Sequence, residues 1–150
     1  MTGIVSQNVA RTSGLIKAAS GGGGVWTKIK EITASSDSTI SFVDGTSDVV
    51  LDSTYPIYVF KWFNTHPSED GRSLCFQANA SGGSGYNETI TSTIFYAFHR
   101  EDDSATTFAY NADRAQAQGT GVQVISFPAG NANDESSSGE LWLFGISSTT

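Results

Sequence analysis

The sequence predicts an all-β protein: a β-sandwich of the jelly-roll type that follows an extended N-terminal arm. Short apolar segments recur roughly every ten to fifteen residues and are separated by turn-forming residues. Good helix formers such as Leu, Met and Lys are sparse, whereas Ser, Thr and Gly are abundant and aromatic residues make up 11% of the chain. About eight short strands without a strong helix are typical of a two-layer sandwich.

The predicted arm comprises residues 1–24, and the predicted sandwich domain comprises residues 25–150. The arm contains two small apolar clusters and ends in four glycines at positions 21–24, which make a flexible joint. Such an arm is either disordered alone or ordered by what it binds. Apolar residues are unusual in a pure linker, so we predict that the arm docks on a partner. The residues predicted to dock are Ile4, Val5, Leu15 and Ile16.

Beyond the arm, the strand pattern is an alternation of apolar and polar residues. Leu74, Phe76 and Ala78 alternate with polar residues, which predicts a strand with one buried face. Asp-Gly at 44–45 supplies the positive φ that tight hairpin turns require. The predicted strands are 25–34, 39–43, 48–51, 55–64, 73–79, 90–99, 106–110, 121–127 and 140–146.

Two segments, 55–63 and 141–146, are apolar on both faces. Successive strand residues point to opposite faces, and only covered strands normally show this pattern. The face of 55–63 predicted to point into the sandwich contains Tyr55, Ile57, Val59 and Phe63. The outer face is predicted to be covered by the arm or by another subunit, because interfaces are enriched in aromatic residues. The predicted interface residues of the two segments are Tyr58, Phe60, Trp62, Trp142 and Phe144.

The charge distribution restricts the partners. Residues 1–30 contain four basic residues and no acid, a charge of +4, whereas residues 31–150 contain the other four basic residues and all fifteen acidic ones, a charge of −11. An acidic body argues against nucleic-acid binding, which needs clustered Lys and Arg. No apolar run approaches the ~18 residues of a membrane span. We therefore predict neither nucleic-acid binding nor membrane insertion. The surplus aromatic face of 55–63 predicts instead a homo-oligomer, for which a trimer is one suitable stoichiometry.

Chemistry-bearing residues are few and scattered. His66 and His99 each end a predicted strand, and two histidines with a distant acid define neither a triad nor a metal site. Loop carboxylates such as Asp44 and Asp48 are possible calcium ligands, but their spacing does not match an EF-hand loop. The single cysteine, Cys75, excludes an intrachain disulfide. We predict no enzyme activity, no cofactor and no catalytic or metal-binding residues.

Several stretches carry a resemblance to known proteins. Gly3–Lys17 and Val25–Lys30, on either side of the glycines, are similar to the N-terminus of structural proteins predicted for marine tailed bacteriophages. Ile40–Tyr55, Val59–Pro67 and Gly139–Phe144 continue this similarity, which covers most of the chain. The resemblance implies a virion component without known activity, assembled in the host cytoplasm: a capsid-decoration, neck or tail-fibre protein that contacts other virion proteins. The similar proteins run on past the equivalent of the last residues here, so a longer parent protein is expected.

A second hypothesis is a lectin-like carbohydrate-binding module that recognises a host-surface glycan. Tryptophans are common platforms for stacking sugars, and the chain has Trp26, Trp62 and Trp142. Tryptophans next to Phe and Tyr in strand patterns are more often part of a core or an interface. This hypothesis therefore requires Trp62 or Trp142 to be open to solvent.

Overall fold

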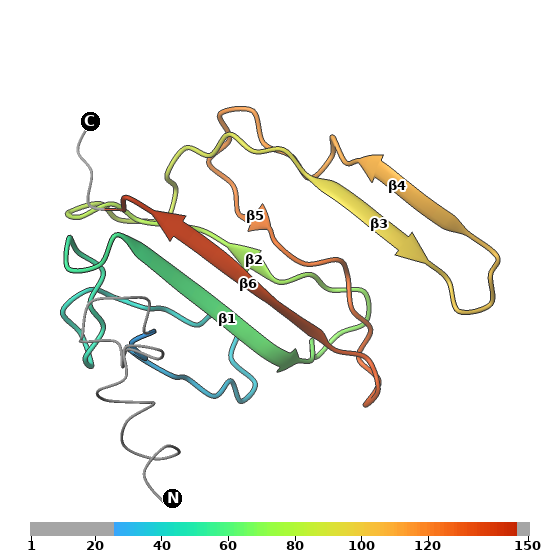
Figure 1. Cartoon of the computed structure of the whole chain (residues 1–150), viewed down its shortest axis with the longest axis horizontal. Coiled ribbons are helices and arrows are strands. Elements are labelled where there is room, and N and C mark those ends of the chain that lie inside the picture. Colours follow the sequence, from blue (N-terminus) through green and yellow to red (C-terminus); the bar gives the residue numbers. More distant parts are fainter. Residues whose placement is uncertain (1–25, 147–150) are drawn as a thin grey trace, which may run out of the picture. The chain divides into compact units, whose positions relative to one another are not determined.

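The computed structural model in Figure 1 describes residues 26–146. This part of the chain is all-β, as the sequence predicts: it contains six strands, and no helix lies within it. The strands are β1 (Ile57–Thr65), β2 (Cys75–Phe76), β3 (Phe95–His99), β4 (Thr106–Tyr110), β5 (Gln123–Val124) and β6 (Ser137–Phe144).

The chain divides between Val50 and Leu51 into two compact units. All six strands belong to the second unit. The division falls within the predicted domain 25–150, and the predicted arm, residues 1–24, lies outside the described residues.

The described residues of the first unit, 26–50, contain no strand, and their backbone turns lie around residues 44–48. The N–H of Gly45 donates to the carbonyl of Val49 at 3.0 Å, and the N–H of Val49 donates to the carbonyl of Thr46 at 3.1 Å. Strands predicted from alternation alone are wrong in this part of the chain, because a strand also needs a neighbour that supplies hydrogen bonds and packing. None of the described residues of these segments pairs in a sheet. The predicted strands concerned are 25–34, 39–43 and 48–51.

The second unit contains three two-stranded antiparallel sheets, β1–β6, β2–β5 and β3–β4. In Figure 1, β1 (green) and β6 (red) lie side by side although they come from opposite ends of this unit. Strands β2 and β5 are short, but their pairing continues through a hydrogen bond from Ile125 N–H to the Leu74 carbonyl (3.0 Å) and through a bridge between Arg72 and Ala129.

The β1–β6 pairing contains a β-bulge. Trp62 pairs with Gly139 but Thr65 pairs with Ser137, so β1 has one more residue than β6 in this interval. Asn64 takes up the extra length with a φ of 51°. This left-handed conformation is one that Asn adopts more readily than most residues. The bulge ends the regular ladder just beyond Trp62.

Gly139 allows the Trp62 ring to lie across the strand pair. A Cβ atom at Gly139 would be 2.9 Å from both Cε2 and Cη2 of Trp62, well inside normal contact. The indole N–H of Trp62 also donates to Ser137 Oγ at 3.2 Å, which holds the ring in place. An aromatic ring that covers a cross-strand glycine stabilises a position that is otherwise weak in a strand.

The core of the described residues is small. Val49 and Tyr58 are the two buried apolar side chains in residues 26–146, with 5% and 4% of their surface exposed. The Tyr58 hydroxyl donates to the carbonyl of Asp52 (3.0 Å) and accepts from the N–H of Asp52 (3.1 Å), which fastens the turn before β1. The Tyr58 ring also meets the Tyr55 ring edge-on, with 5.8 Å between centroids.

A buried polar residue organises the region around β5. Gln123 is 9% exposed, and its side-chain oxygen accepts from Ser92 Oγ at 2.6 Å. Its side-chain amide donates to the carbonyls of Val124 (2.9 Å) and Arg114 (3.3 Å). Ser92 Oγ in turn accepts from the N–H of Gln116 at 2.9 Å. Buried polar groups need hydrogen bonds, so this network fixes the segment after β4 onto β5.

We expect Gly139→Ala to lower the free energy of unfolding by about 1–3 kcal/mol, because the added methyl group must displace the Trp62 ring. The measurement is the urea midpoint followed by circular dichroism. Gly121→Ala is the control, because a Cβ at that position meets nothing closer than 3.9 Å. If both variants unfold at the same urea concentration, the Trp62–Gly139 contact does not have this role.

Candidate functional site

The candidate functional site is the open face of the β1–β6 pair. The strand register places Ile57 opposite Phe144, and Val59 opposite Trp142. These side chains alternate with the covered ones on each strand, so they share one face of the pair. Phe63 follows on β1, next to the bulge. We call this surface the open face; its apolar residues are Ile57, Val59, Phe63, Trp142 and Phe144.

Most of the open face is exposed. The exposed fraction is 73% for Phe63, 66% for Phe144, 40% for Trp142 and 39% for Ile57. The rings of Trp142 and Phe144 stack on each other, with 6.4 Å between centroids and an interplanar angle of 16°. Single exposed apolar residues are normal, but a contiguous apolar patch indicates an interaction site.

An ion pair lies within the open face. Lys61 is opposite Glu140, and Lys61 Nζ is 2.9 Å from Glu140 Oε2. The hydrogen bond from Lys61 lowers the pKa of Glu140, and a hydrogen bond involving Trp142 lowers this pKa further. The carboxylate of Glu140 therefore interacts with both a cation and an aromatic side chain. The open face is apolar apart from this ion pair.

The structure corrects which side of β1 is covered. The sequence predicts that Tyr58, Phe60 and Trp62 point outward, but Tyr58 is buried and the other two are half-buried. The reason is chemical: the Tyr58 hydroxyl bonds to Asp52, and Trp62 fits onto Gly139. Phe63, predicted to point inward, is largely exposed instead. Ile57, also predicted to point inward, lies on the same exposed side.

The other predicted interface residues divide into two groups. Trp142 and Phe144 are exposed on the open face, where the predicted interface places them. Leu141 and Leu143, which alternate with Trp142 and Phe144 along β6, are half-buried on the covered side opposite Phe60 and Tyr58. The four predicted docking residues of the arm lie outside the described residues: Ile4, Val5, Leu15 and Ile16.

Sequence reasoning missed a second exposed aromatic surface, on the β3–β4 hairpin. Phe95, Phe108 and Tyr110 are 63%, 79% and 53% exposed. Phe95 pairs with Tyr110, and Phe108 pairs with Ala97, so the three rings share one face. Phe108 and Tyr110 are two residues apart, so the sequence already indicates that they share one face of a strand. Phe95 lies on the same side of β3 as Ala97 and His99, which suggests a mostly polar face. Pairing with β4 then places Phe95 beside the two aromatic residues of that strand.

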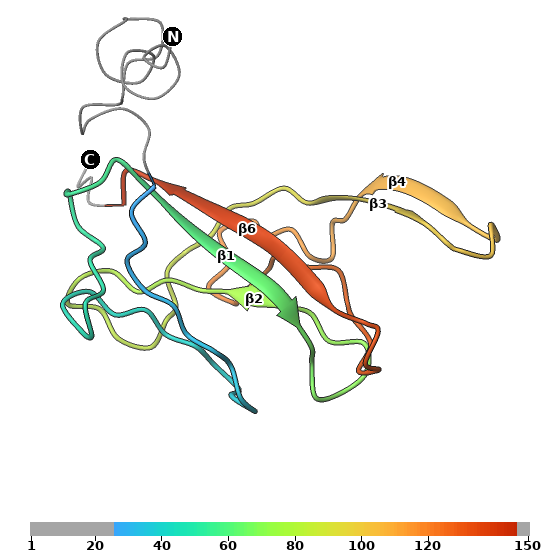
Figure 2. The ribbon, with the colours of Figure 1, turned by 60° about the horizontal axis from the view of Figure 1, so that its bottom comes forward.

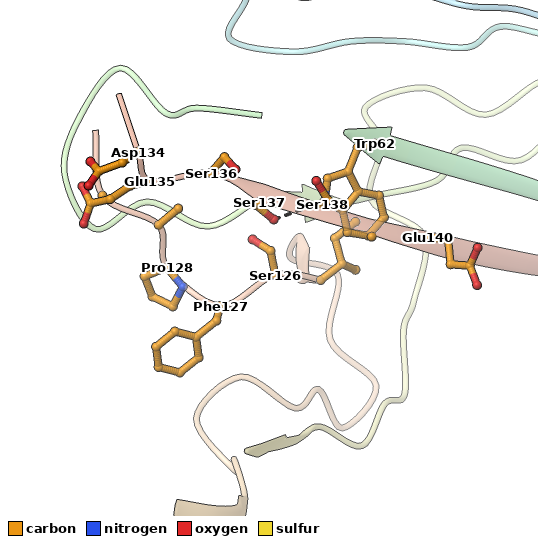
Figure 3. A pocket seen from close by; sticks show the side chains of 14 residues that line it. Trp62, Ser126, Phe127, Pro128, Asp134, Glu135, Ser136, Ser137, Ser138 and Glu140 are labelled. Atoms are coloured by element: carbon orange, nitrogen blue, oxygen red, sulfur yellow. Dashed lines mark hydrogen bonds between the residues drawn. The ribbon is translucent and has the colours of Figure 1, made fainter. Parts of the chain in front are cut away.

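A depression of about 670 Å³ lies beside β6 (Figure 3) and is lined by Trp62 and by residues 125–130 and 134–140. It contains serine hydroxyls and the carboxylates of Asp134 and Glu135. Glu135 is engaged by the N–H of Ala132, which donates to it at 3.0 Å. The two aromatic residues are engaged as well, Trp62 over Gly139 and Phe127 against the rings of β3. The depression offers no free aromatic platform, so it is a weaker candidate than the open face.

The histidines have local partners. His66 Nε2 lies 3.1 Å from Asn64 Oδ1, and His99 Nε2 lies 2.8 Å from Asp103 Oδ1 at the tip of the β3–β4 hairpin. Within residues 26–146, no group of three or more His, Cys, Asp or Glu side chains converges as a metal site would require.

Comparisons with protein-family models, with curated proteins and with solved structures found no match to this chain. In the part of the chain that the structure describes, no helix is long and apolar enough to cross a membrane.

Glu140→Gln is expected to show how the ion pair responds to pH. A lowered carboxyl pKa stabilises the folded state above the ordinary value of 4.5, and this stabilisation is lost as the pH falls through the folded pKa. The wild type should therefore melt slightly above the variant at neutral pH and together with it well below pH 4.5. Glu101→Gln, which removes the same charge on the hairpin tip, is the control; a gap that persists in acid would contradict the assignment.

Proposed function

We propose that this chain is a non-enzymatic structural protein of a bacteriophage virion, which assembles through its N-terminal arm and an aromatic strand face. The observation that supports this most is the shortage of core. A chain of this length can bury roughly 68–70% of its unfolded surface. Yet Val49 and Tyr58 are the buried apolar side chains in residues 26–146, while aromatic rings cover two open sheet faces.

Such a distribution is typical of a subunit that completes its core with neighbours. Interfaces between obligate partners resemble a domain core cut in half. With the orientation of β1 corrected, the proposed assembly surface is the open face, which retains Trp142 and Phe144 from the sequence prediction. Tyr58, Phe60 and Trp62 lie on the opposite, covered side of the same strand pair.

The virion part of the proposal is supported by the resemblance to structural proteins of marine tailed bacteriophages. Capsid-decoration proteins cover the shell in many copies, which fits a chain with open apolar faces. The charge distribution fits as well, because a leader with charge +4 complements a body with charge −11. The proposed location is the virion, with other copies and other virion proteins as partners.

The jelly-roll sandwich remains part of this proposal. The three two-stranded sheets of the second unit each have an exposed face or exposed edges. A two-stranded sheet alone is marginally stable in water. In the proposed assembly, apposed faces provide the second layer that a sandwich core needs.

Substituting the apolar residues of the arm tests this function. In the full chain, Ile4→Ser combined with Leu15→Ser should reduce the copy number per particle at least several-fold, because docking loses two buried side chains. The measurement is quantitative mass spectrometry of purified particles, and Ser6→Ala with Ser13→Ala is the matched control. Normal occupancy of the Ile4→Ser, Leu15→Ser variant would contradict arm docking, and absence of the wild-type chain from particles would contradict the virion role.

The alternative, a lectin-like carbohydrate-binding module, has one observation in its favour. Trp142 is 40% exposed and lies beside the Lys61–Glu140 pair, so an aromatic ring and polar groups are adjacent, as sugar binding requires. A glycan array with the wild type and Trp142→Ala separates the two functions. The structural role predicts no specific glycan; a glycan bound by the wild type and lost in the variant would favour the lectin.

A further inference from the structure

The loop between β2 and β3 brings three oxygen atoms together beside Gly83. Figure 2 shows this loop (yellow-green), and its residues 79–88 belong to the second unit. A Cβ atom at Gly83 would lie 3.1 Å from Asn79 Oδ1 and 3.1 Å from the carbonyl oxygen of Ala80. The same Cβ would lie 3.4 Å from Glu88 Oε1. We call these three oxygens the loop cluster.

Hydrogen bonds within the loop hold each oxygen of the cluster in place. Asn79 Nδ2 donates to the carbonyl of Gly83 at 2.7 Å, which sets the orientation of the amide and leaves Oδ1 in the cluster. The N–H of Gly83 donates to the carbonyl of Ala80 at 2.9 Å. The N–H of Ala80 in turn donates to Glu88 Oε1 at 2.9 Å. Each oxygen accepts at most one of these bonds, so lone pairs remain for a ligand.

Asn79 Oδ1 is the atom that indicates a binding site. This oxygen is buried from solvent, and no hydrogen-bond donor among residues 26–146 reaches it. Buried side-chain oxygens normally accept a hydrogen bond or contact an ion, because losing water without compensation is costly. The neighbouring atoms of the cluster are oxygens too, and they repel one another. One positively charged ligand would compensate all three.

The chemistry of the cluster fits calcium. Ca²⁺ binds carboxylate oxygens, Asn side-chain oxygens and peptide carbonyls, and it accepts flexible geometry with about six to eight ligands. Mg²⁺ requires a smaller, nearly ideal octahedron, which a loop with glycines at positions 82, 83 and 85 does not impose. Residues 81–87 are exposed, so water can supply the remaining ligands.

We propose that this loop binds a calcium ion through Asn79 Oδ1, the carbonyl oxygen of Ala80 and the carboxylate of Glu88, with water completing the shell. A single carboxylate predicts weak binding, with a dissociation constant on the order of 10⁻⁴–10⁻³ M. The charge of −11 on residues 31–150 attracts cations to the site. The inference is independent of the virion role, because it depends on this loop alone.

Calcium titration of the full chain tests this site. After treatment with a chelator, CaCl₂ up to about 10 mM should raise the Tm along a saturating curve, because the unfolded chain does not hold the three oxygens together. The references are MgCl₂ at the same concentration and NaCl at the same ionic strength, which should raise the Tm less. Equal effects of Ca²⁺ and Mg²⁺, or no saturation, would indicate general screening of an acidic chain and overturn the proposal.

Glu88→Gln separates calcium binding from the structure of the loop. The variant loses the charge, but its side-chain oxygen can still accept from the N–H of Ala80. Its Ca²⁺ affinity should fall about tenfold or more. Glu101→Gln is the matched control, since it removes the same charge from the turn between β3 and β4 and should bind Ca²⁺ like the wild type. An unchanged affinity in Glu88→Gln would contradict the assignment.

Hydrogen exchange of the wild type locates the ion and decides the question if Glu88→Gln does not fold. Ca²⁺ should slow exchange several-fold in peptides that cover residues 79–88, because ligation restricts local opening of the loop. Peptides from β1 and β6 should exchange at unchanged rates. Absence of slowing in 79–88, or equal slowing throughout the chain, would overturn the proposal.

Discussion

The antiparallel pairing of β1 with β6 is the contact on which the rest of the second unit depends. It joins Ile57 to Phe144, so the other four strands lie within the loop that it closes. The entropy of closing a loop grows slowly with its length, so the pairing is stabilised mainly by what it covers. That covered side contains Tyr58, held by the backbone of Asp52, and Trp62, held over Gly139. Each strand pair has only two faces, and covering one in this way leaves the other open.

The same constraint applies to the β3–β4 hairpin and explains the shortage of core. Tyr96 and Phe98 are satisfied by Phe127, so Phe95, Phe108 and Tyr110 are left on the outside. A chain that does not bury these rings internally loses part of the hydrophobic free energy that normally offsets conformational entropy. If neighbouring copies supply the missing layer, the free energy of association contributes to the free energy of folding. Stability then rises with protein concentration.

The sequence predicts the all-β class and the places of β4 and of most of β1 and β6, because these segments have strong alternation and large side chains. It does not predict that 25–34, 39–43 and 48–51 lack strands, since alternation carries no information about a pairing partner. The sequence also does not show which side of β1 is covered, because both sides contain aromatic residues. That choice depends on distant partners: Gly139 can accept the Trp62 ring, and Asp52 can bond the Tyr58 hydroxyl. The exposed aromatic surface of the β3–β4 hairpin is not predicted for the same reason, because only strand pairing brings Phe95 beside Tyr110.

Open aromatic faces also create a risk of unspecific aggregation, and the charges on them limit it. Lys61 and Glu140 pair across the open face, and His99 faces Asp103 at the end of the hairpin. An ion pair within an apolar surface makes a wrong docking register costly, because it would be desolvated without new partners. Charged side chains on exposed strands are a common protection against edge-to-edge association. In the proposed assembly, the aromatic rings therefore provide the energy of association, while these few charges restrict the geometry in which that energy is available.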